Sequence, residues 1–198
     1  MNPNFIKMKN ILCDFIEQFV PLTEDEKNVI LELDVIKYFK KGTLILKQGK
    51  RTSESYFVLK GCIRVYYILD GTEKTTEFFT ELEGYTPPCV LSNQPSELYV
   101  SCVEDSIIAI SKPNMAEEVF KKFPKFETVC RILSEQLIVK SQTNFADFKT
   151  SSPEQRYLNL MKERPDLIQR VPQYQLASYL GIKPESLSRM RARIVGKK

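Results

Sequence analysis

The stretch that decides the fold is Gln173 to Ile194, QYQLASYLGIKPESLSRMRARI, near the C-terminal end of the chain. Its spacing predicts a helix-turn-helix, with Ala177 where the two helices cross and Gly181 in the turn. Leu187 returns to the core from the second helix. Pro184 suits the first turn of that helix, where its missing N–H would have no helical partner. Apolar residues separated by three, four or seven positions complete the buried face: Leu176, Leu180, Ile182, Met190 and Ile194.

The polar residues of the second helix lie away from this predicted core. They are Glu185, Ser186, Ser188, Arg189, Arg191 and Arg193. An ordinary helical hairpin with a solvated arginine face would show the same spacing, so the distribution of charge is the useful discriminator. Residues 151–198 contain ten Lys or Arg against four Asp or Glu, whereas residues 1–150 contain nineteen against twenty-one. A basic segment on a slightly acidic body favours binding to phosphates.

The composition indicates one sizeable domain with a smaller one attached. The chain has 198 residues, of which 42% are hydrophobic and 27% charged. No apolar run approaches the roughly 18 residues of a membrane span, and the N-terminal residues lack the apolar centre of a signal peptide. We therefore expect a cytoplasmic protein that has no membrane contact.

The residue types present disfavour metal and catalytic chemistry. The five cysteines, at positions 13, 62, 89, 102 and 130, form no CxxC pair, so we expect mostly buried free thiols rather than a zinc or iron–sulfur site. Histidine is absent from the sequence, which removes the commonest general base and metal ligand. We expect no enzymatic activity, no metal and no cofactor, while an unidentified small-molecule effector is compatible with the sequence.

The N-terminal residues predict two short helices. The first covers residues 5–19, where apolar side chains share one helical face, and Pro21 ends it. Thr23 and Glu26 form a predicted capping box for a second helix that reaches about Leu33. Both helices are expected to pack against the next domain.

The sequence from Val35 to Ser111 has the alternation of short β-strands. β-branched and aromatic residues gather in short runs between glycines. Asp70-Gly71 stands between two such runs and predicts a two-residue hairpin turn. Seven or eight strands at this spacing predict an antiparallel roll, barrel or sandwich.

A long helix is predicted to follow, because no proline or glycine interrupts residues 125–148. Alternating steps of four and three, the spacing of a coiled-coil seam, separate Phe126, Cys130, Leu133, Leu137, Lys140 and Asn144. A helix packed on its own β domain would give much the same stripe. We favour dimerisation through this seam, since it extends beyond what one small roll needs.

The linker at 150–152 leads into the helix-turn-helix region. Ser152 and Gln155 predict a capping box for the next helix, with Pro153 at its first position. Leu167 to Val171 is predicted to be a brief strand or turn.

The order of these elements resembles the Crp/Fnr family of bacterial transcription regulators. The segments QLASYLGIKPESLSRMRARI, ESYFVLKGCIRVYY and YVSCVEDSIIAIS carry the resemblance. It implies an α+β fold with an N-terminal antiparallel β-roll of the cyclic-nucleotide-binding type (a double-stranded β-helix) and flanking helices. The implied units are the N-terminal helices and sensor roll at 1–123, a dimerisation helix at 124–149 and a DNA-binding domain at 150–198.

The resemblance also implies a homodimer that binds a palindromic site in double-stranded DNA and contacts RNA polymerase. By position, Glu185 and Arg189 match the family's base-reading residues, and these types suit cytosine N4 and guanine O6/N7. Pro184 replaces a second base-reading arginine of many members, so we expect a different half-site preference. Contacts to the DNA backbone, or close approach to it, are assigned to Gln173, Lys183, Ser186, Ser188, Arg191, Arg193 and the Lys197-Lys198 tail.

The effector region departs from the family pattern. The family's cassette has a glycine-glutamate pair and then an arginine that neutralises the cyclic phosphate, whereas this chain has Pro88, Cys89 and Ser96 near those positions. Because a buried phosphate without a cation is costly, we expect no binding of cyclic AMP in the family manner. The candidate effector pocket contains Tyr85, Cys89 and Ser96. A rival hypothesis is a small-molecule-sensing module that regulates a protein partner, with a degenerate helix-turn-helix.

Overall fold

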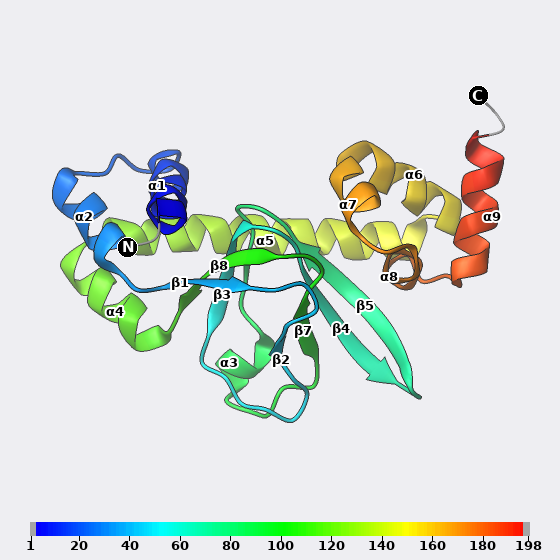
Figure 1. Cartoon of the computed structure of the whole chain (residues 1–198), viewed down its shortest axis with the longest axis horizontal. Coiled ribbons are helices and arrows are strands. Elements are labelled where there is room, and N and C mark those ends of the chain that lie inside the picture. The colour runs from blue at the N-terminus through cyan, green and yellow to red at the C-terminus, as the bar shows by residue number, and fades with distance from the viewer. Residues whose placement is uncertain (1–2, 196–198) are drawn as a thin grey trace.

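Two four-stranded antiparallel sheets form the centre of the molecule (Figure 1). The computed structural model describes residues 3–195, and it describes side-chain burial for residues 6–194. One sheet has the order β1-β8-β3-β6 and the other β2-β7-β4-β5, which confirms the predicted α+β class with an antiparallel roll. The strands are β1 (Ile36–Phe39), β2 (Leu44–Leu46), β3 (Ser55–Lys60), β4 (Ile63–Leu69), β5 (Thr72–Phe79), β6 (Gly84–Tyr85), β7 (Tyr99–Cys102) and β8 (Ser106–Ser111).

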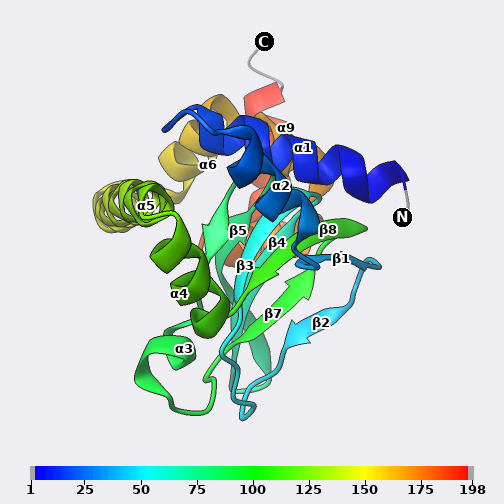
Figure 2. The same cartoon turned by 90° about the vertical axis from the view of Figure 1, so that its left-hand side faces the viewer.

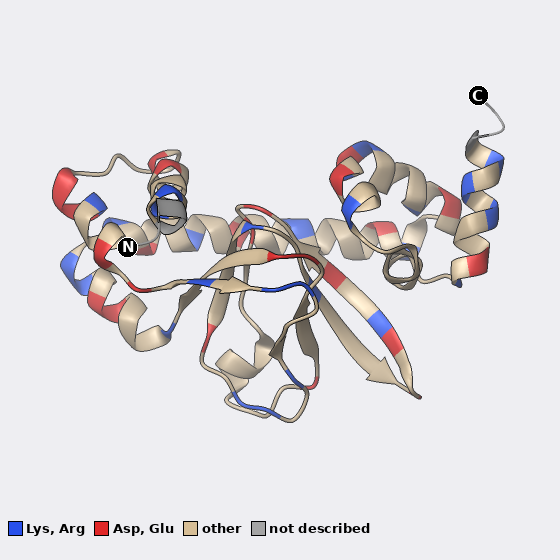
Figure 3. Ribbon diagram, in the orientation of Figure 1, with Lys and Arg blue, Asp and Glu red and all other residues tan. Residues whose placement is uncertain are grey.

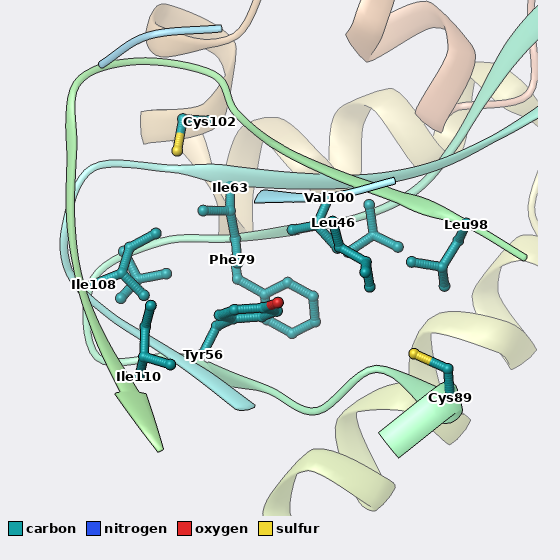
Figure 4. Packing of buried hydrophobic residues seen from close by; sticks show 12 residues of the cluster. Leu46, Tyr56, Ile63, Phe79, Cys89, Leu98, Val100, Cys102, Ile108 and Ile110 are labelled. Carbon is teal, nitrogen blue, oxygen red and sulfur yellow. The ribbon is translucent and has the colours of Figure 1, made fainter. Parts of the chain in front are cut away.

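Apolar side chains fill the interior of the roll (Figure 4). Tyr56 and Val58 point inward from β3, as the two-residue period of a strand requires, and are 2% and 0% exposed. Phe79, Val100 and Ile108 extend the same cluster from β5, β7 and β8. Removal of this apolar surface from water is the main force that holds the roll together.

The hairpin of β4 and β5 has the predicted turn. Leu69 pairs with Thr72, which leaves Asp70 and Gly71 as the two turn residues. Their φ angles are 50° and 70°, and a type I′ turn needs positive φ at both central positions. The predicted two-residue hairpin is therefore confirmed, and it projects from the body of the roll (Figure 1).

Helices lie at both ends of the sheets (Figures 1 and 2). The predicted capping box is confirmed, because Thr23 N–H donates to Glu26 Oε2 over 2.7 Å while Thr23 Oγ1 accepts from Glu26 N–H. No helix among residues 3–195 is both long and apolar enough to cross a membrane. The helices outside the C-terminal region are α1 (Pro3–Glu17), α2 (Glu24–Glu32), α3 (Pro88–Ser92), α4 (Pro113–Lys122) and α5 (Lys125–Thr150).

One face of α5 packs on its own chain along the predicted seam. Phe126 is buried in a cluster with Cys13 and Ile30 of the N-terminal helices. Farther along, Leu137 packs against the core of the roll, and Lys140 forms an ion pair with Glu83. The rest of the stripe is less covered, because Cys130 is exposed and Leu133 is only half-buried, so dimerisation through the predicted seam stays a prediction.

A second face of α5, beside the packed one, remains largely uncovered in the single chain. Ile138, Val139 and Phe145 lie there with side chains 57%, 62% and 65% exposed. Ile138 and Phe145 are seven residues apart, so they fall in one row along the helix. An apolar row on a solvent-facing helix needs a partner to bury it.

Two local predictions in the C-terminal region are wrong. Residues predicted as a strand or turn form helix α7 (Pro165–Arg170), which buries Leu167 at 1% exposure. Ser152 caps α6 (Pro153–Glu163) by accepting from Gln155 N–H over 3.2 Å, but the Gln155 side chain donates to Asn159 instead. The capping box at Ser152 is therefore only half formed.

Candidate nucleic-acid interface

Helices α8 (Gln173–Tyr179) and α9 (Pro184–Val195) form the predicted helix-turn-helix. Gly181 has a φ of +71°, the left-handed conformation in which glycine ends a helix at no steric cost. A Cβ atom at this position would lie 3.1 Å from the ring of Phe148. The turn therefore requires glycine both for its backbone and for the close approach of the long helix.

The predicted core of the helix-turn-helix is confirmed. Leu176, Ala177 and Leu187 are completely buried at 0% exposure, and Leu180 and Met190 are nearly so. They share one cluster with Phe78 of β5, while Ile182 and Ile194 are partly buried against it. Burial of this face fixes which side of α9 points outward.

The outward side of α9 carries the two predicted base-reading residues. Glu185 and Arg189 are exposed and four residues apart, and exposed Ser188 and Ala192 lie beside them at helical spacing. The helix stands at the edge of the molecule, away from the roll (Figure 1), and basic positions recur along its ribbon (Figure 3). No ion pair within residues 3–195 engages Arg189 or Arg191. These two guanidinium groups are free for an anionic partner.

The residues predicted to contact the DNA backbone surround this outward side. Arg193 is exposed but forms an ion pair with Glu154 of α6, at 2.6 Å between Nη2 and Oε2. Arg191 and Ser186 are half-buried on the two flanks of α9. Gln173 and Lys183 are exposed at the starts of the two helices, and Ser188 lies among the outward residues. Lys197 and Lys198 lie outside the described residues.

The helix-turn-helix is held against the β4–β5 hairpin. Ser178 Oγ accepts from Thr75 N–H and donates to the Glu73 carbonyl, both at 2.9 Å. The rings of Phe78 and Tyr179 meet edge to face, with centroids 5.4 Å apart. The orientation of α9 is thereby tied to a strand of the roll.

Arg170 makes the most extensive polar contact between the roll and the C-terminal helices. Its Nη1 donates to Glu81 Oε2 over 2.8 Å, its Nε to Glu104 Oε1 over 3.0 Å, and its Nη2 to the Gly61 carbonyl over 2.9 Å. Charge-assisted bonds of this kind are stronger than neutral ones. Sequence analysis missed this role, because Arg170 and Glu81 are 89 positions apart and nothing local pairs them.

Two more basic residues of the C-terminal quarter have structural roles. Arg164 Nη2 donates to Thr80 Oγ1 over 2.8 Å and lies 3.3 Å from a Glu83 oxygen. Arg156 donates to carbonyl oxygens at the end of α5 and to the Leu180 carbonyl at the end of α8. Some of the basic residues in excess in the C-terminal quarter therefore make contacts within the protein, and others lie on the surface of α9.

Two of the predicted effector residues, Tyr85 and Cys89, pack in the apolar cluster of the roll. Tyr85 pairs with Tyr56 across β6 and β3, and its ring centroid is 4.8 Å from that of Phe79. Burial raises the pKa of the Tyr85 hydroxyl well above its usual range. Cys89 is buried on α3 in the same cluster (Figure 4). Ser96 is buried as well, and its Oγ donates to the Leu98 carbonyl over 2.9 Å.

Comparisons with known proteins agree with this architecture. Residues 36–123 match the family model described as the cyclic nucleotide-binding domain. No curated protein matches the sequence of this chain.

Solved structures match the chain over most of its length. FixK2 from Bradyrhizobium japonicum is 15% identical with a TM-score of 0.66, covering 82% of this chain and 84% of its own. The c-di-GMP responsive global regulator CLP of Xanthomonas campestris is 14% identical with a TM-score of 0.64, covering 82% and 86%. A transcriptional regulator of the CRP/FNR family from Thermus thermophilus is 16% identical with a TM-score of 0.62, covering 82% and 86%. The predicted resemblance is confirmed at the level of the fold: the chain has the Crp/Fnr fold, with a cyclic nucleotide-binding domain at residues 36–123.

Proposed function

We propose that this protein is a homodimeric, sequence-specific DNA-binding transcription regulator of the Crp/Fnr type. The single observation that carries the proposal is the outward side of α9, where Glu185 and Arg189 are exposed and Arg189 has no ion pair within residues 3–195. An α-helix fits the major groove of B-form DNA, and side chains on its outer side reach base edges there. The proposal assigns the protein no catalytic activity and places it in the bacterial cytoplasm, with RNA polymerase as a further partner.

The residues of α9 divide into two roles in this proposal. Arg189 donates both ends of its guanidinium to guanine O6 and N7, and Glu185 accepts from cytosine N4. The residues on the flanks contact phosphates or allow close approach, which sets affinity and register but not sequence choice. They are Gln173, Lys183, Ser186, Ser188, Arg191 and Arg193.

The uncovered face of α5 provides the dimer contact. Ile138, Val139 and Phe145 would pack against the same residues of a second chain around a two-fold axis. Such a pair presents two α9 helices to one duplex, and half-sites about 34 Å apart match one turn of B-form DNA. We accordingly assign residues 1–123 to sensing, 124–149 to dimerisation and 150–198 to DNA binding.

The residue at position 96 supports the absence of cyclic AMP binding in the family manner. Ser96 offers no positive charge for a cyclic phosphate, and its hydroxyl is already bonded to Leu98. CLP, a structural neighbour, is a c-di-GMP responsive regulator, so this fold is compatible with a ligand other than cyclic AMP. We therefore leave Tyr85, Cys89 and Ser96 as a candidate pocket only for a different ligand.

A salt titration of DNA binding tests the proposal. Fluorescence anisotropy would be measured with the full chain and a labelled duplex selected from a random library. We expect the logarithm of affinity to fall linearly with the logarithm of salt concentration, and Arg191→Ala to reduce the slope by about one unit. Lys37→Ala, an exposed residue of β1 far from α9, is the matched control and should leave the slope unchanged.

The same titration separates the proposal from its rival. A module that regulates a protein partner through a degenerate helix-turn-helix would show no salt-dependent binding to any duplex. Sedimentation of the free protein provides the second arm, because Ile138→Asp should convert a dimer to a monomer. A monomeric wild-type protein would contradict the dimer.

A further inference from the structure

A cavity of about 590 Å³ lies at the junction of the roll and the C-terminal helices. Its walls come from β5, the second half of α5, α6 and the end of α8. Ligand pockets in proteins commonly have volumes of about 300–1,000 Å³. The interior of the roll differs, since its side chains pack against one another (Figure 4).

The positive charges at this cavity already have partners. Lys140 and Arg164 both pair with Glu83, which lies outside the lining. Arg156 donates to three carbonyl oxygens, and its guanidinium lies over the ring of Phe148 at 4.5 Å. An anionic ligand would have to displace these contacts.

The carboxylate of Glu77 differs from these cations, because it forms a hydrogen bond but no ion pair in the described part of the chain. It lines the cavity from β5, it is half-buried, and no ion pair within residues 3–195 engages it. Burial raises the pKa of the Glu77 carboxyl, although the charges of Lys140 and Arg164 and a hydrogen bond to Asn144 oppose this rise. A cation placed beside Glu77 would relieve this cost.

Apolar surface completes the chemistry of the site. Leu160 of α6 and Tyr179 of α8 line the cavity, and exposed Phe145 stands at its rim. An aromatic or aliphatic group is suited to these side chains, and an ammonium group is suited to Glu77.

We propose that this cavity binds a small amine, with its ammonium group on Glu77 and its apolar part against Leu160 and Tyr179. Because the walls belong to both β5 and the C-terminal helices, the occupied cavity would set the orientation of α9. That consequence rests on the proposed function, whereas binding of the amine does not.

Three probes of equal size and different charge test the site by amide NMR titration of the full chain. They are 2-phenylethylamine, 2-phenylethanol and phenylacetate. We expect the amine to bind about 10-fold more tightly than the alcohol, as one charge-assisted hydrogen bond implies, with phenylacetate weakest. The shifts should centre on Thr75 to Glu77, Asn144 and Leu160.

Glu77→Gln supplies the decisive comparison. It should lower the amine affinity to that of the alcohol while it leaves alcohol binding unchanged, which shows that the cavity is intact. Glu118→Gln on α4, an exposed carboxylate outside the cavity, is the control and should change nothing. Equal binding of all probes, no binding, full amine binding by Glu77→Gln, or shifts centred on the roll interior would each overturn the proposal. None of these results depends on whether the protein binds DNA.

Discussion

Arginines in two parts of the C-terminal quarter serve different ends. Arg164 and Arg170 face the roll, with side chains only 21% and 24% exposed, and both bond to carboxylates of β-strands or their loops. Arg189 stands exposed on α9 without an ion pair in the described part of the chain. The difference shows that basic residues near a helix-turn-helix count toward DNA binding only when their side chains are not already bonded within the protein.

The largest effect should come from removing the contact to the roll at Arg170. Arg170→Met removes hydrogen bonds to Glu81, Glu104 and the Gly61 carbonyl and should lower the free energy of unfolding by about 3 kcal/mol, since each bond to a charged group contributes about 1.5–3 kcal/mol and solvent screens these half-exposed groups. Urea denaturation followed by circular dichroism measures this. Arg191→Ala, on the flank of α9, is the matched control and should change stability by less than about 0.5 kcal/mol. Equal losses of stability in the two variants would contradict the conclusion that Arg170 has a structural role and Arg191 does not.

A somewhat smaller effect should follow from Arg189→Ala, and it should appear in binding. Loss of a bidentate contact to guanine should cost about 1–3 kcal/mol on the preferred sequence and relax base preference at one half-site position. Arg193→Ala should instead weaken binding to all sequences alike. Competition between preferred and random duplexes distinguishes the outcomes. If both variants lose affinity equally on both duplexes, the two assigned roles are wrong.

Acid should weaken the contact at Arg170. Burial alone would raise the pKa of Glu81, but hydrogen bonds from Arg170 and from the Gly61 N–H hold it below its ordinary value of 4.5. A carboxyl whose pKa is lower in the folded than in the unfolded protein stabilises the fold at pH values above its unfolded-state pKa. This stabilisation is lost as the pH falls through the folded-state pKa. Below pH 4.5 the wild type should therefore lose stability more steeply than Arg170→Met. If the free energy of unfolding falls equally with pH in the wild type and in Arg170→Met, this coupling is contradicted.

The smallest expected effect concerns Glu154. Its ion pair with Arg193 is exposed, 40% and 58% for the two side chains, so it adds little to stability. Glu154→Gln should free Arg193 for a phosphate, which strengthens DNA binding about two-fold to five-fold and steepens the salt dependence. Glu163→Gln, an exposed carboxylate of the same helix without an ion pair among residues 3–195, is the control. Unchanged affinity in Glu154→Gln would place Arg193 away from the duplex.

Much of the fold could be predicted because its signals are local. The hairpin at Asp70-Gly71 and the capping box at Thr23 depend on residues within four positions of one another, and both are present. The core face of the helix-turn-helix follows from helical spacing and is buried as predicted.

What could not be predicted depends on contacts between distant segments. The stripe on α5 has the same spacing whether it meets a second chain or its own roll, and the contact of Leu137 with the roll core could not be read from that spacing. Leu167 lies in a helix because its side chain is buried among the C-terminal helices, which outweighs the turn propensity of its neighbours. The carboxylates of the roll that Arg164 and Arg170 contact lie 66 to 89 positions away, so no local pattern predicts these pairs.

Selection of bound duplexes from a random library tests the central claim most directly, namely that two symmetric α9 helices recognise bases in successive major grooves. The account predicts an enriched two-fold symmetric motif with half-sites about one helical turn apart, and loss of one guanine preference in each half-site with Arg189→Ala. Enrichment of no sequence, or of a single asymmetric site that Arg189→Ala leaves unchanged, would contradict it.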